Sequence, residues 1–274
     1  MILKKQKQSS PKKEKILVRN NLSSKIKIIR IEDKKRFSIT DLTAREVNLV
    51  ILLNNQEFTS LNCSPGNYQF LAVGFLYTNG IITRSEDIES INIDKNKVYI
   101  TLNKTVVPIK KSINLHSPVM VSKPITEAES NKRFSSKEIM FIKSDIIFTL
   151  LRNMQEKAHL FDRTGGVHSC ALADGKGSLL LFCEDISRYN TVDRILGEAL
   201  LKNINLADKI ILTSCRITRG ILEKIINGKV STVISRSAVT DNAIILAKEA
   251  LITLVGFARG NRMNIYSFPE NIID

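Results

Sequence analysis

The stretch Thr164-Gly-Gly-Val-His-Ser-Cys-Ala-Leu-Ala-Asp-Gly-Lys-Gly177, which continues to Glu184-Asp-Ile-Ser-Arg-Tyr-Asn-Thr-Val-Asp-Arg194, carries the strongest fold signal in the chain. Apolar runs over 169–173 and 179–183 flank a turn at 174–177, and this pattern predicts a β-hairpin. A helix is expected to begin shortly after the second run. The stretch therefore predicts two strands and a helix start, with polar side chains at the strand ends.

The same stretch gathers residue types that form binding sites. Gly165-Gly166 allows a sharp turn or a close approach of the backbone to a ligand, because glycine lacks a Cβ. His168 precedes the first apolar run, and Arg188 and Asn190 follow the second. Taken singly, His168 could be a hydrogen-bonded core histidine and Asp185 a helix cap. The cluster as a whole favours a binding site.

Apolar strands and helices alternate in the remainder of the chain. Strands are expected at 210–213, 230–234, 252–257 and 263–266, and helices over 192–200, 221–226 and 242–250. Such alternation is typical of a mainly parallel sheet with helices on both faces. The sequence therefore predicts an α/β fold for this region.

Arginine follows or ends three successive strands of that predicted sheet, at Arg216, Arg236 and Arg259. In such sheets ligands bind beyond the carboxyl ends of the strands. The guanidinium fork suits phosphate or carboxylate groups. We therefore expect the three arginines at one edge of the sheet, facing an anionic ligand.

The N-terminal half predicts a smaller unit. Strands at 47–53 and 57–61 and a hairpin within 91–102 flank a helix that Ser64 can cap, with Pro65 in its first turn. We divide the chain into a flexible basic tail (1–22), a small mixed α+β domain (23–103), a proline-interrupted loop (104–136) and an α/β cofactor-binding domain (137–274).

Composition narrows the function classes. The net charge of +14 favours an anionic partner, but the basic residues lack interleaved aromatic side chains, which argues against nucleic acid. The four widely spaced cysteines form no Cys-x-x-Cys pair, which argues against a zinc site and a disulfide framework. No membrane-spanning run or secretory signal is seen, so a cytoplasmic protein without membrane attachment is expected.

Several ordered motifs resemble the formate dehydrogenase accessory sulfurtransferase family (FdhD type). The motifs span from about residue 40 to the C-terminus. They are Asn62-Cys-Ser-Pro65, Leu71-Ala-Val-Gly-Phe-Leu76, Gly80-Ile-Ile82, Thr164-Gly-Gly-Val-His168, Glu184-Asp-Ile-Ser-Arg-Tyr-Asn-Thr-Val-Asp193, Ser237-Ala-Val-Thr240 and Gly256-Phe-Ala-Arg-Gly-Asn-Arg-Met-Asn-Ile-Tyr266.

The resemblance implies a homodimer with a cytidine-deaminase-like C-terminal domain. It implies a sulfur carrier that takes sulfur from a cysteine desulfurase and passes it to the molybdenum or tungsten bis(molybdopterin guanine dinucleotide) cofactor of formate dehydrogenase. The family's cofactor-contacting segment matches Phe257, Ala258, Arg259, Gly260, Asn261 and Arg262. We expect further cofactor contacts from Gly165, Gly166, His168, Arg188, Asn190 and Arg216.

One departure from the family concerns the sulfur-carrying loop. The family pattern Ser-Cys-Gly-x-Cys-Gly-Lys matches Ser117 to Lys123 here, and Pro118 and Val121 stand at the two cysteine positions. A persulfide requires a thiol, because the thiolate is the nucleophile. Whether the chain is an active sulfurtransferase is therefore left open by the sequence.

Two hypotheses follow from that departure. Sulfur transfer could use another thiol, with Cys170 as the first candidate and Cys215 as the second. Alternatively, the chain is a cofactor-binding chaperone or degenerate paralogue that moves no sulfur. A nucleoside deaminase, the third possibility, is disfavoured because its chemistry needs His-x-Glu and Cys-x-x-Cys to hold zinc, and His168-Ser169-Cys170 provides neither.

Overall fold

The computed structural model describes residues 22–103 and 140–274. The predicted basic tail, apart from residue 22, and the predicted loop with Pro118 and Val121 lie outside the described residues. None of the helices within the described ranges is long and apolar enough to cross a membrane.

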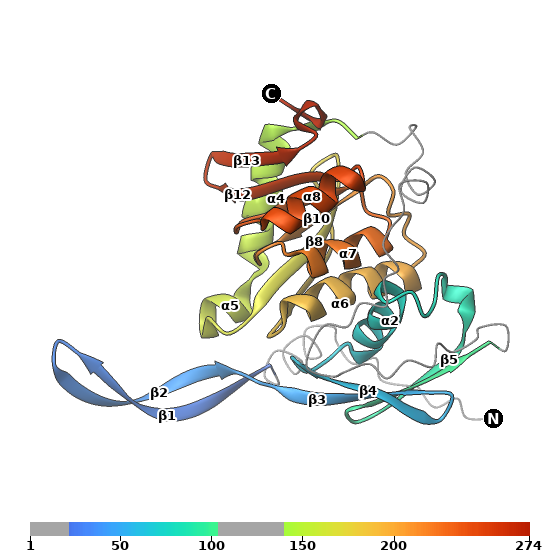
Figure 1. The fold of residues 1–274 in the computed structure, drawn as a ribbon. Coiled ribbons are helices and arrows are strands. Elements are labelled where there is room, and N and C mark those ends of the chain that lie inside the picture. Colours follow the sequence, from blue (N-terminus) through green and yellow to red (C-terminus); the bar gives the residue numbers. More distant parts are fainter. Residues whose placement is uncertain (1–21, 104–139) are drawn as a thin grey trace, which may run out of the picture.

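A six-stranded sheet forms the centre of the C-terminal part (Figure 1). Its strands lie in the order β13 (Arg262–Ser267), β12 (Thr253–Arg259), β11 (Thr232–Ser235), β10 (Lys209–Thr213), β8 (His168–Asp174) and β9 (Leu179–Asp185). The α/β fold class is confirmed. The expectation of a mainly parallel sheet is correct only for β10, β11 and β12, because the other three pairings are antiparallel. Tight turns join β8 to β9 and β12 to β13, and only antiparallel strands can be joined in this way.

Helices cover both faces of this sheet, as predicted. One face carries α6 (Arg188–Leu201), α7 (Arg219–Asn227) and α8 (Asp241–Glu249), and the other carries α4 (Ser144–Lys157). Alternate residues of β8 serve the two faces: Cys170 and Leu172 join the core on the α6 side, and Ala171 and Ala173 join the core under α4. The short pair β7 (Ile142–Lys143) and β14 (Ile272–Ile273) lies beside α4.

The N-terminal part contains a four-stranded sheet and a helix. The sheet order is β4 (Gln56–Cys63), β3 (Val47–Leu53), β6 (Lys97–Leu102) and β5 (Ile88–Asp94), and the helix is α2 (Tyr68–Thr78). The predicted cap is wrong: α2 begins after Asn67, which has a left-handed conformation (φ 48°). Ser64 instead donates its backbone N–H to Asp185 Oδ2 (3.1 Å), and its Oγ accepts the N–H of Ile186 (3.2 Å).

Two glycines bring α2 and α6 into close contact. A Cβ on Gly74 would lie 1.7 Å from the carbonyl oxygen of Asp193, and a Cβ on Gly197 would lie 2.0 Å from that of Phe70. The helix backbones therefore touch without intervening side chains. One apolar cluster runs through this crossing, from Leu49 and Ile100 in the smaller sheet to Leu254 in the larger one.

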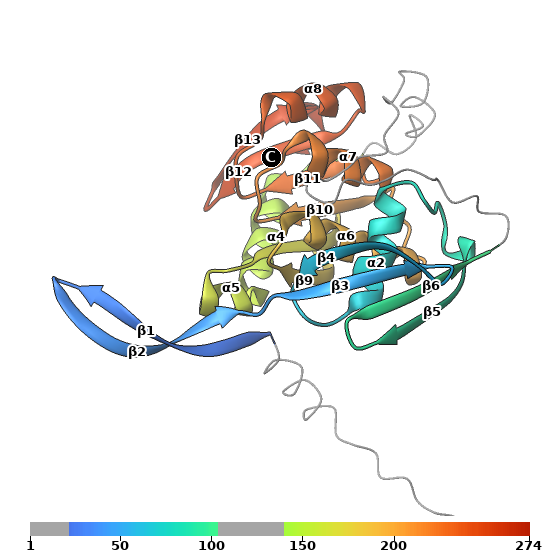
Figure 2. The ribbon, with the colours of Figure 1, turned by 60° about the horizontal axis from the view of Figure 1, so that its bottom comes forward.

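The strands β1 (Ser23–Glu32) and β2 (Lys35–Ala44) form a separate antiparallel hairpin. Figure 2 shows this hairpin, in blue, extending away from both sheets. The alternation of charged residues and isoleucine over 25–31 predicted a solvent-facing strand, and most side chains of β1 are exposed. We call residues 23–44 the arm.

The glycine crossing predicts a large effect of one methyl group. Gly197→Ala places its Cβ against backbone atoms of α2, which cannot move aside as a flexible side chain can. We expect the free energy of unfolding to fall by about 2–3 kcal/mol, the upper range of overpacking. Chemical denaturation measures this change. Gly175→Ala is the matched control, because its Cβ meets only the side chain of Met140; equal stability of the two variants would contradict the crossing.

Candidate functional site

The carboxyl ends of the three parallel strands meet at one edge of the sheet. Thr213 pairs with Ser235, and Ile234 pairs with Val255, so the strands end side by side. The backbone N–H of Arg236 donates to the carbonyl of Thr213 across this edge (3.0 Å). The predicted placement of Arg216, Arg236 and Arg259 at a common edge is confirmed.

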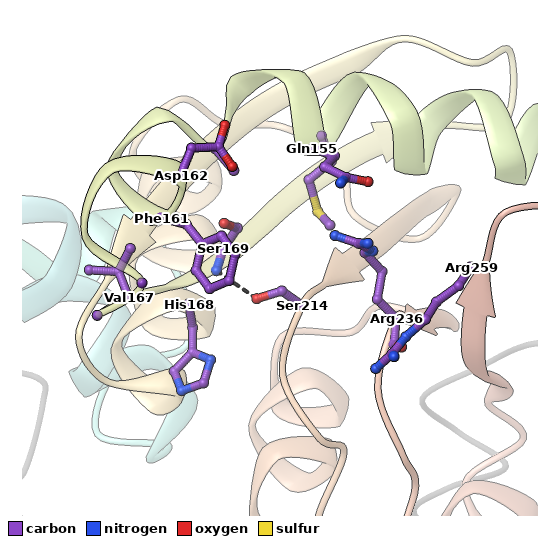
Figure 3. A pocket seen from close by; sticks show the side chains of 13 residues that line it. Gln155, Phe161, Asp162, Val167, His168, Ser169, Ser214, Arg236 and Arg259 are labelled. Atoms are coloured by element: carbon purple, nitrogen blue, oxygen red, sulfur yellow. Dashed lines mark hydrogen bonds between the residues drawn. The ribbon is translucent and has the colours of Figure 1, made fainter. Parts of the chain in front are cut away.

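A cavity of about 540 Å³ opens at this edge, between the strand ends, α4 and α5 (His159–Thr164). Figure 3 shows Arg236 and Arg259 on one side, His168, Val167 and Phe161 on the other, and Ser214 between them. The cavity is lined by Met154, Gln155, Ala158, Phe161, Asp162, Gly165, Gly166, Val167, His168, Ser169, Ser214, Arg236 and Arg259.

Two arginines, Arg236 and Arg259, give the cavity lining its positive charge. Arg259 Nε donates to the backbone carbonyl of Arg236 at 2.6 Å. Burial and the neighbouring Arg259 charge lower the pKa of Arg236. Neither guanidinium forms an ion pair with a carboxylate of residues 22–103 or 140–274, and Asp162 lies across the cavity (Figure 3). Two adjacent cations without a partner carboxylate favour an anionic ligand.

His168 lies at the start of β8, half-buried at the cavity wall. Its pKa is lowered by burial first, and then by the charges of Arg188 and Arg216, against an opposing effect of Asp185. The imidazole is therefore neutral at pH 7. In this state it offers one hydrogen-bond donor and one acceptor to a ligand, and adds no positive charge.

The predicted glycine pair forms part of the cavity rim. Gly165 ends α5 in a left-handed conformation (φ 62°), and its N–H donates to the carbonyl of Phe161 at 2.7 Å. A Cβ on Gly166 would lie 3.2 Å from the Cβ of Ala44, the last residue of β2. Gly166 thus lets the base of the arm approach the rim of the cavity.

The structure brings only some of the predicted residues to the cavity. Gly165, Gly166, His168 and Arg259 line it, and Arg236 joins them. The Nδ2 of buried Asn190 donates to the carbonyl of Asn62 (2.8 Å) and to Asp185 Oδ1 (2.9 Å), so Asn190 serves the junction between the two parts. Predicted residues outside the lining are Arg188, Asn190, Arg216, Phe257, Ala258, Gly260, Asn261 and Arg262.

Sequence reasoning missed the α4–α5 wall of the cavity, which includes Gln155, Phe161 and Asp162. The helix α5 is only six residues long, too short for a periodic pattern. Its N-terminal N–H groups, on Leu160 and Phe161, donate to the carboxylate of Glu184 at 3.0 and 2.8 Å. That contact joins segments more than 20 residues apart in the chain, so no local sequence pattern predicts it.

All four cysteines of the chain are unfavourable nucleophiles in this structure. Burial raises the pKa of each thiol, to about 12 for Cys63 and well above the ordinary value for Cys170. Cys170 is fully buried. An imidazolium at His168 could lower the pKa of a nearby thiol, but the pKa of His168 is itself lowered, which disfavours that charged form. The geometry therefore opposes Cys170, and equally buried Cys215, as a sulfur carrier.

Asp185 belongs to a buried network behind the cavity. Its Oδ2 accepts from Arg194 Nε at 2.8 Å, and its Oδ1 accepts from the N–H of Ser187 at 2.9 Å. Burial raises the pKa of this carboxyl, opposed by Arg194 and the hydrogen bonds. The interpretation of Asp185 as a helix cap is wrong: Ser187 is the residue that precedes α6, no side chain caps that helix, and Asp185 instead accepts the N–H of Ser187.

Comparison with known proteins places these features in a family. The chain is 34% identical over 254 residues to "Sulfur carrier protein FdhD" of Staphylococcus aureus (strain MRSA252), which covers 90% of this chain and 95% of that protein. The protein of the same name from strain JH9 is 32% identical over 258 residues, with the same coverages.

A solved structure shows the same fold. It is described as the crystal structure of a putative formate dehydrogenase accessory protein from Desulfotalea psychrophila. The two chains share 24% identity with a TM-score of 0.76, over 92% of this chain and 100% of that chain. The model of the FdhD/NarQ family matches residues 44–273, which include both sheets and the whole cavity. The chain belongs to the FdhD/NarQ family.

Proposed function

We propose that this protein is a cytoplasmic accessory sulfur carrier in the maturation of formate dehydrogenase. In this role it takes sulfur from a cysteine desulfurase and delivers it to the molybdenum or tungsten bis(molybdopterin guanine dinucleotide) cofactor, which the cavity holds. The homodimer implied by the family resemblance is part of the proposal. Family membership and the names of the curated relatives support the carrier role.

The observation that carries the cofactor assignment is the pair of unmatched guanidinium groups, Arg236 and Arg259, at a cavity of about 540 Å³. Guanine dinucleotides present phosphates, which such groups bind with charge-assisted hydrogen bonds. The neutral imidazole of His168 and the hydroxyl of Ser214 provide donors and acceptors suited to the polar edge of a base. The donor set of the cavity therefore fits a phosphate-bearing nucleotide.

In this scheme the chain's own residues bind and orient the ligand. Arg236 and Arg259 hold phosphate. Gly166 has no side chain, which lets Ala44 approach the cavity rim. The bound cofactor supplies the metal centre that accepts the sulfur atom. A carrier thiol would receive that sulfur as a persulfide: its thiolate attacks the outer sulfur of the desulfurase persulfide, a new S–S bond forms, and the desulfurase cysteine leaves as a thiolate.

A second candidate function is favoured by the poor accessibility of the four cysteines, of which Cys63, Cys170 and Cys215 are buried and Cys183 is partly buried. The family's loop cysteines are replaced by Pro118 and Val121, and the chain has no exposed alternative among its cysteines. In this version the protein binds the cofactor and hands it over without carrying sulfur. The two versions share the cavity and differ only in the thiol step.

The cavity assignment predicts which arginines matter for binding. Arg236→Ala and Arg259→Ala should each weaken the binding of a guanine nucleotide by about 1.5–3 kcal/mol, because each removes a charged hydrogen-bond donor. Titration calorimetry at fixed salt measures this loss. Arg219→Ala is the matched control, because Arg219 lies on α7 and pairs with Glu223. Unchanged binding by both cavity variants would show that the nucleotide lies elsewhere.

The environment of His168 predicts a pH effect. The pKa of His168 is lower in the folded chain than in the unfolded chain. As the pH falls below about 6.5, the unfolded chain therefore takes up a proton at His168 before the folded chain does. His168 thus contributes stability above that pH and loses it as pH falls towards the lowered value. NMR titration should show a lowered pKa that rises when a guanine nucleotide binds, since phosphate favours the imidazolium. If the pKa of His168 is the same with and without the nucleotide, His168 is not part of the binding site.

The buried thiols predict slow chemistry. Under native conditions, none of the four cysteines should react rapidly with a thiol reagent, whereas all four should react after denaturation. Incubation with a cysteine desulfurase, followed by mass spectrometry, separates the two versions: a chain without persulfide supports the cofactor-binding version, and a persulfide on the chain supports the sulfur carrier.

The matching genetic test is complementation of a strain that lacks its own family member. The second candidate function predicts failure with this chain and partial rescue by Pro118→Cys with Val121→Cys and flanking glycines. Full rescue by the unmodified chain, abolished by Cys170→Ser, would instead establish Cys170 as the carrier and reject the second candidate function.

A further inference from the structure

The arm is the least supported element of the described chain. Its ten-residue strands pair only with each other, and the register runs from Ser23 opposite Ala44 to Glu32 opposite Lys35. A two-stranded hairpin alone is marginally stable in water. Figures 1 and 2 both show it projecting from the body, so its outer part has no third layer. A surface of this kind gains stability when a partner covers it.

The two faces of the arm differ in charge. Paired residues share a face and successive residues alternate. One face carries Lys25, Lys27, Ile29 and Ile31, with Arg36 opposite Ile31, and it holds three cations and no carboxylate. We call these five residues the basic face.

The opposite face is balanced. Ile26, Ile28 and Ile39 lie there with Phe37, and the cations Arg30 and Lys35 are matched by Glu32 and Asp41. The charge excess of the arm therefore lies on the basic face alone.

The basic face also carries the two most exposed apolar side chains of the arm. Ile29 and Ile31 are 59% and 64% exposed, compared with 46% for Ile26 and 44% for Phe37 on the opposite face. None of the ion pairs within residues 22–103 and 140–274 includes an arm side chain. Exposed isoleucines between unpaired cations fit an apolar strip bordered by carboxylates.

The base of the arm reaches the candidate site. Ala44, at the end of β2, approaches Gly166 on the cavity rim, and β2 also contacts α5, which carries the cavity residue Phe161. A protein seated on the arm would stand beside the cavity mouth. Such a position suits the protein that receives the ligand from the cavity.

We propose that the basic face of the arm is the docking surface for the client enzyme, the formate dehydrogenase polypeptide, through an acidic surface of that enzyme with an apolar strip. The identity of the client rests on the proposed function. The chemistry of the surface rests on the arm itself.

Two other occupants fit the face less well. A symmetric contact with a second copy through this face would bring its three cations against the same three cations of the other chain, which opposes association at this surface. Nucleic acid would satisfy the cations but not the two exposed isoleucines, and the basic face has no aromatic residue for base stacking. A carboxylate-bearing protein surface satisfies both the charge and the apolar contacts.

The test compares the two faces of one arm by titration calorimetry, with formate dehydrogenase apoprotein as the probe. Ile29→Ser with Ile31→Ser, and separately Lys27→Glu with Arg36→Glu, should each weaken binding by about tenfold or more. The matched controls on the opposite face are Ile26→Ser with Phe37→Ser, and Arg30→Glu with Lys35→Glu. The controls carry the same kinds of change, so a general loss of hairpin structure would affect both faces alike. We expect them to retain binding within about twofold.

Each other outcome overturns the proposal. Equal binding by both sets of variants, or no binding by the unmodified chain, would reject the docking surface. Loss of cysteine desulfurase binding instead would assign the face to the sulfur donor, and a change in oligomeric state by sedimentation would assign it to a second copy. Guanine-nucleotide binding, measured on the same samples, separates the two proposals: its absence in the unmodified chain counts against the proposed function, and its retention in arm variants leaves that function standing.

Discussion

The buried carboxylate of Asp185 is the interaction on which the arrangement of the whole molecule depends. An ion removed from water destabilises the fold unless hydrogen bonds replace its hydration. Here both oxygens are occupied: Oδ1 by Ser187 and Asn190, and Oδ2 by Arg194 and the backbone of Ser64. The network joins the end of β9, the first turn of α6 and the N-terminal part in one place.

Arg194 extends this network into the N-terminal part. Its Nη1 donates to the carbonyl of Gly66 (2.5 Å) and its Nη2 to that of Ser64 (2.6 Å), and these carbonyls belong to the loop before α2. Asp193, the residue immediately before Arg194 in α6, pairs with Lys224 of α7 and accepts a hydrogen bond from Thr78 of α2. The close approach at Gly74 and Gly197 is thus held by polar contacts at its side. The same polar network therefore holds both sheets in place, and with them the strand ends that line the cavity.

The fixed positions of the strand ends determine which charged side chains lie together in the cavity. Arg236 and Arg259 remain adjacent because each follows or ends a strand of the parallel part, and like charges at this distance are stable only with an anion or solvent between them. The same packing buries Cys63, Cys170 and Cys215 and leaves Cys183 partly buried. A scaffold that holds a ligand in place and buries its sulfur atoms is better suited to binding than to nucleophilic chemistry. Ligand binding and sulfur transfer are therefore separate properties of this fold.

The sequence alone determined the local structure. Periodicity placed β8, β9, β10 and the helices α6 to α8, the turn residues placed the hairpins, and the strand-end positions of Arg216, Arg236 and Arg259 indicated a common edge. The motif from Thr164 to Arg194 indicated where polar groups gather, although Asn190 within it proved to support the junction. These signals are readable because they depend on residues close together in the chain.

Only the tertiary structure decided contacts between distant segments. Ser64 binds Asp185, 121 residues away, where the sequence suggested a cap. Glu184 holds the short helix α5, and the orientation of the outer strands made the sheet mixed. The burial of Cys170 depends on helices that cover its strand. The distinction between the two faces of the arm needed the strand register, because only the register shows which residues lie opposite one another.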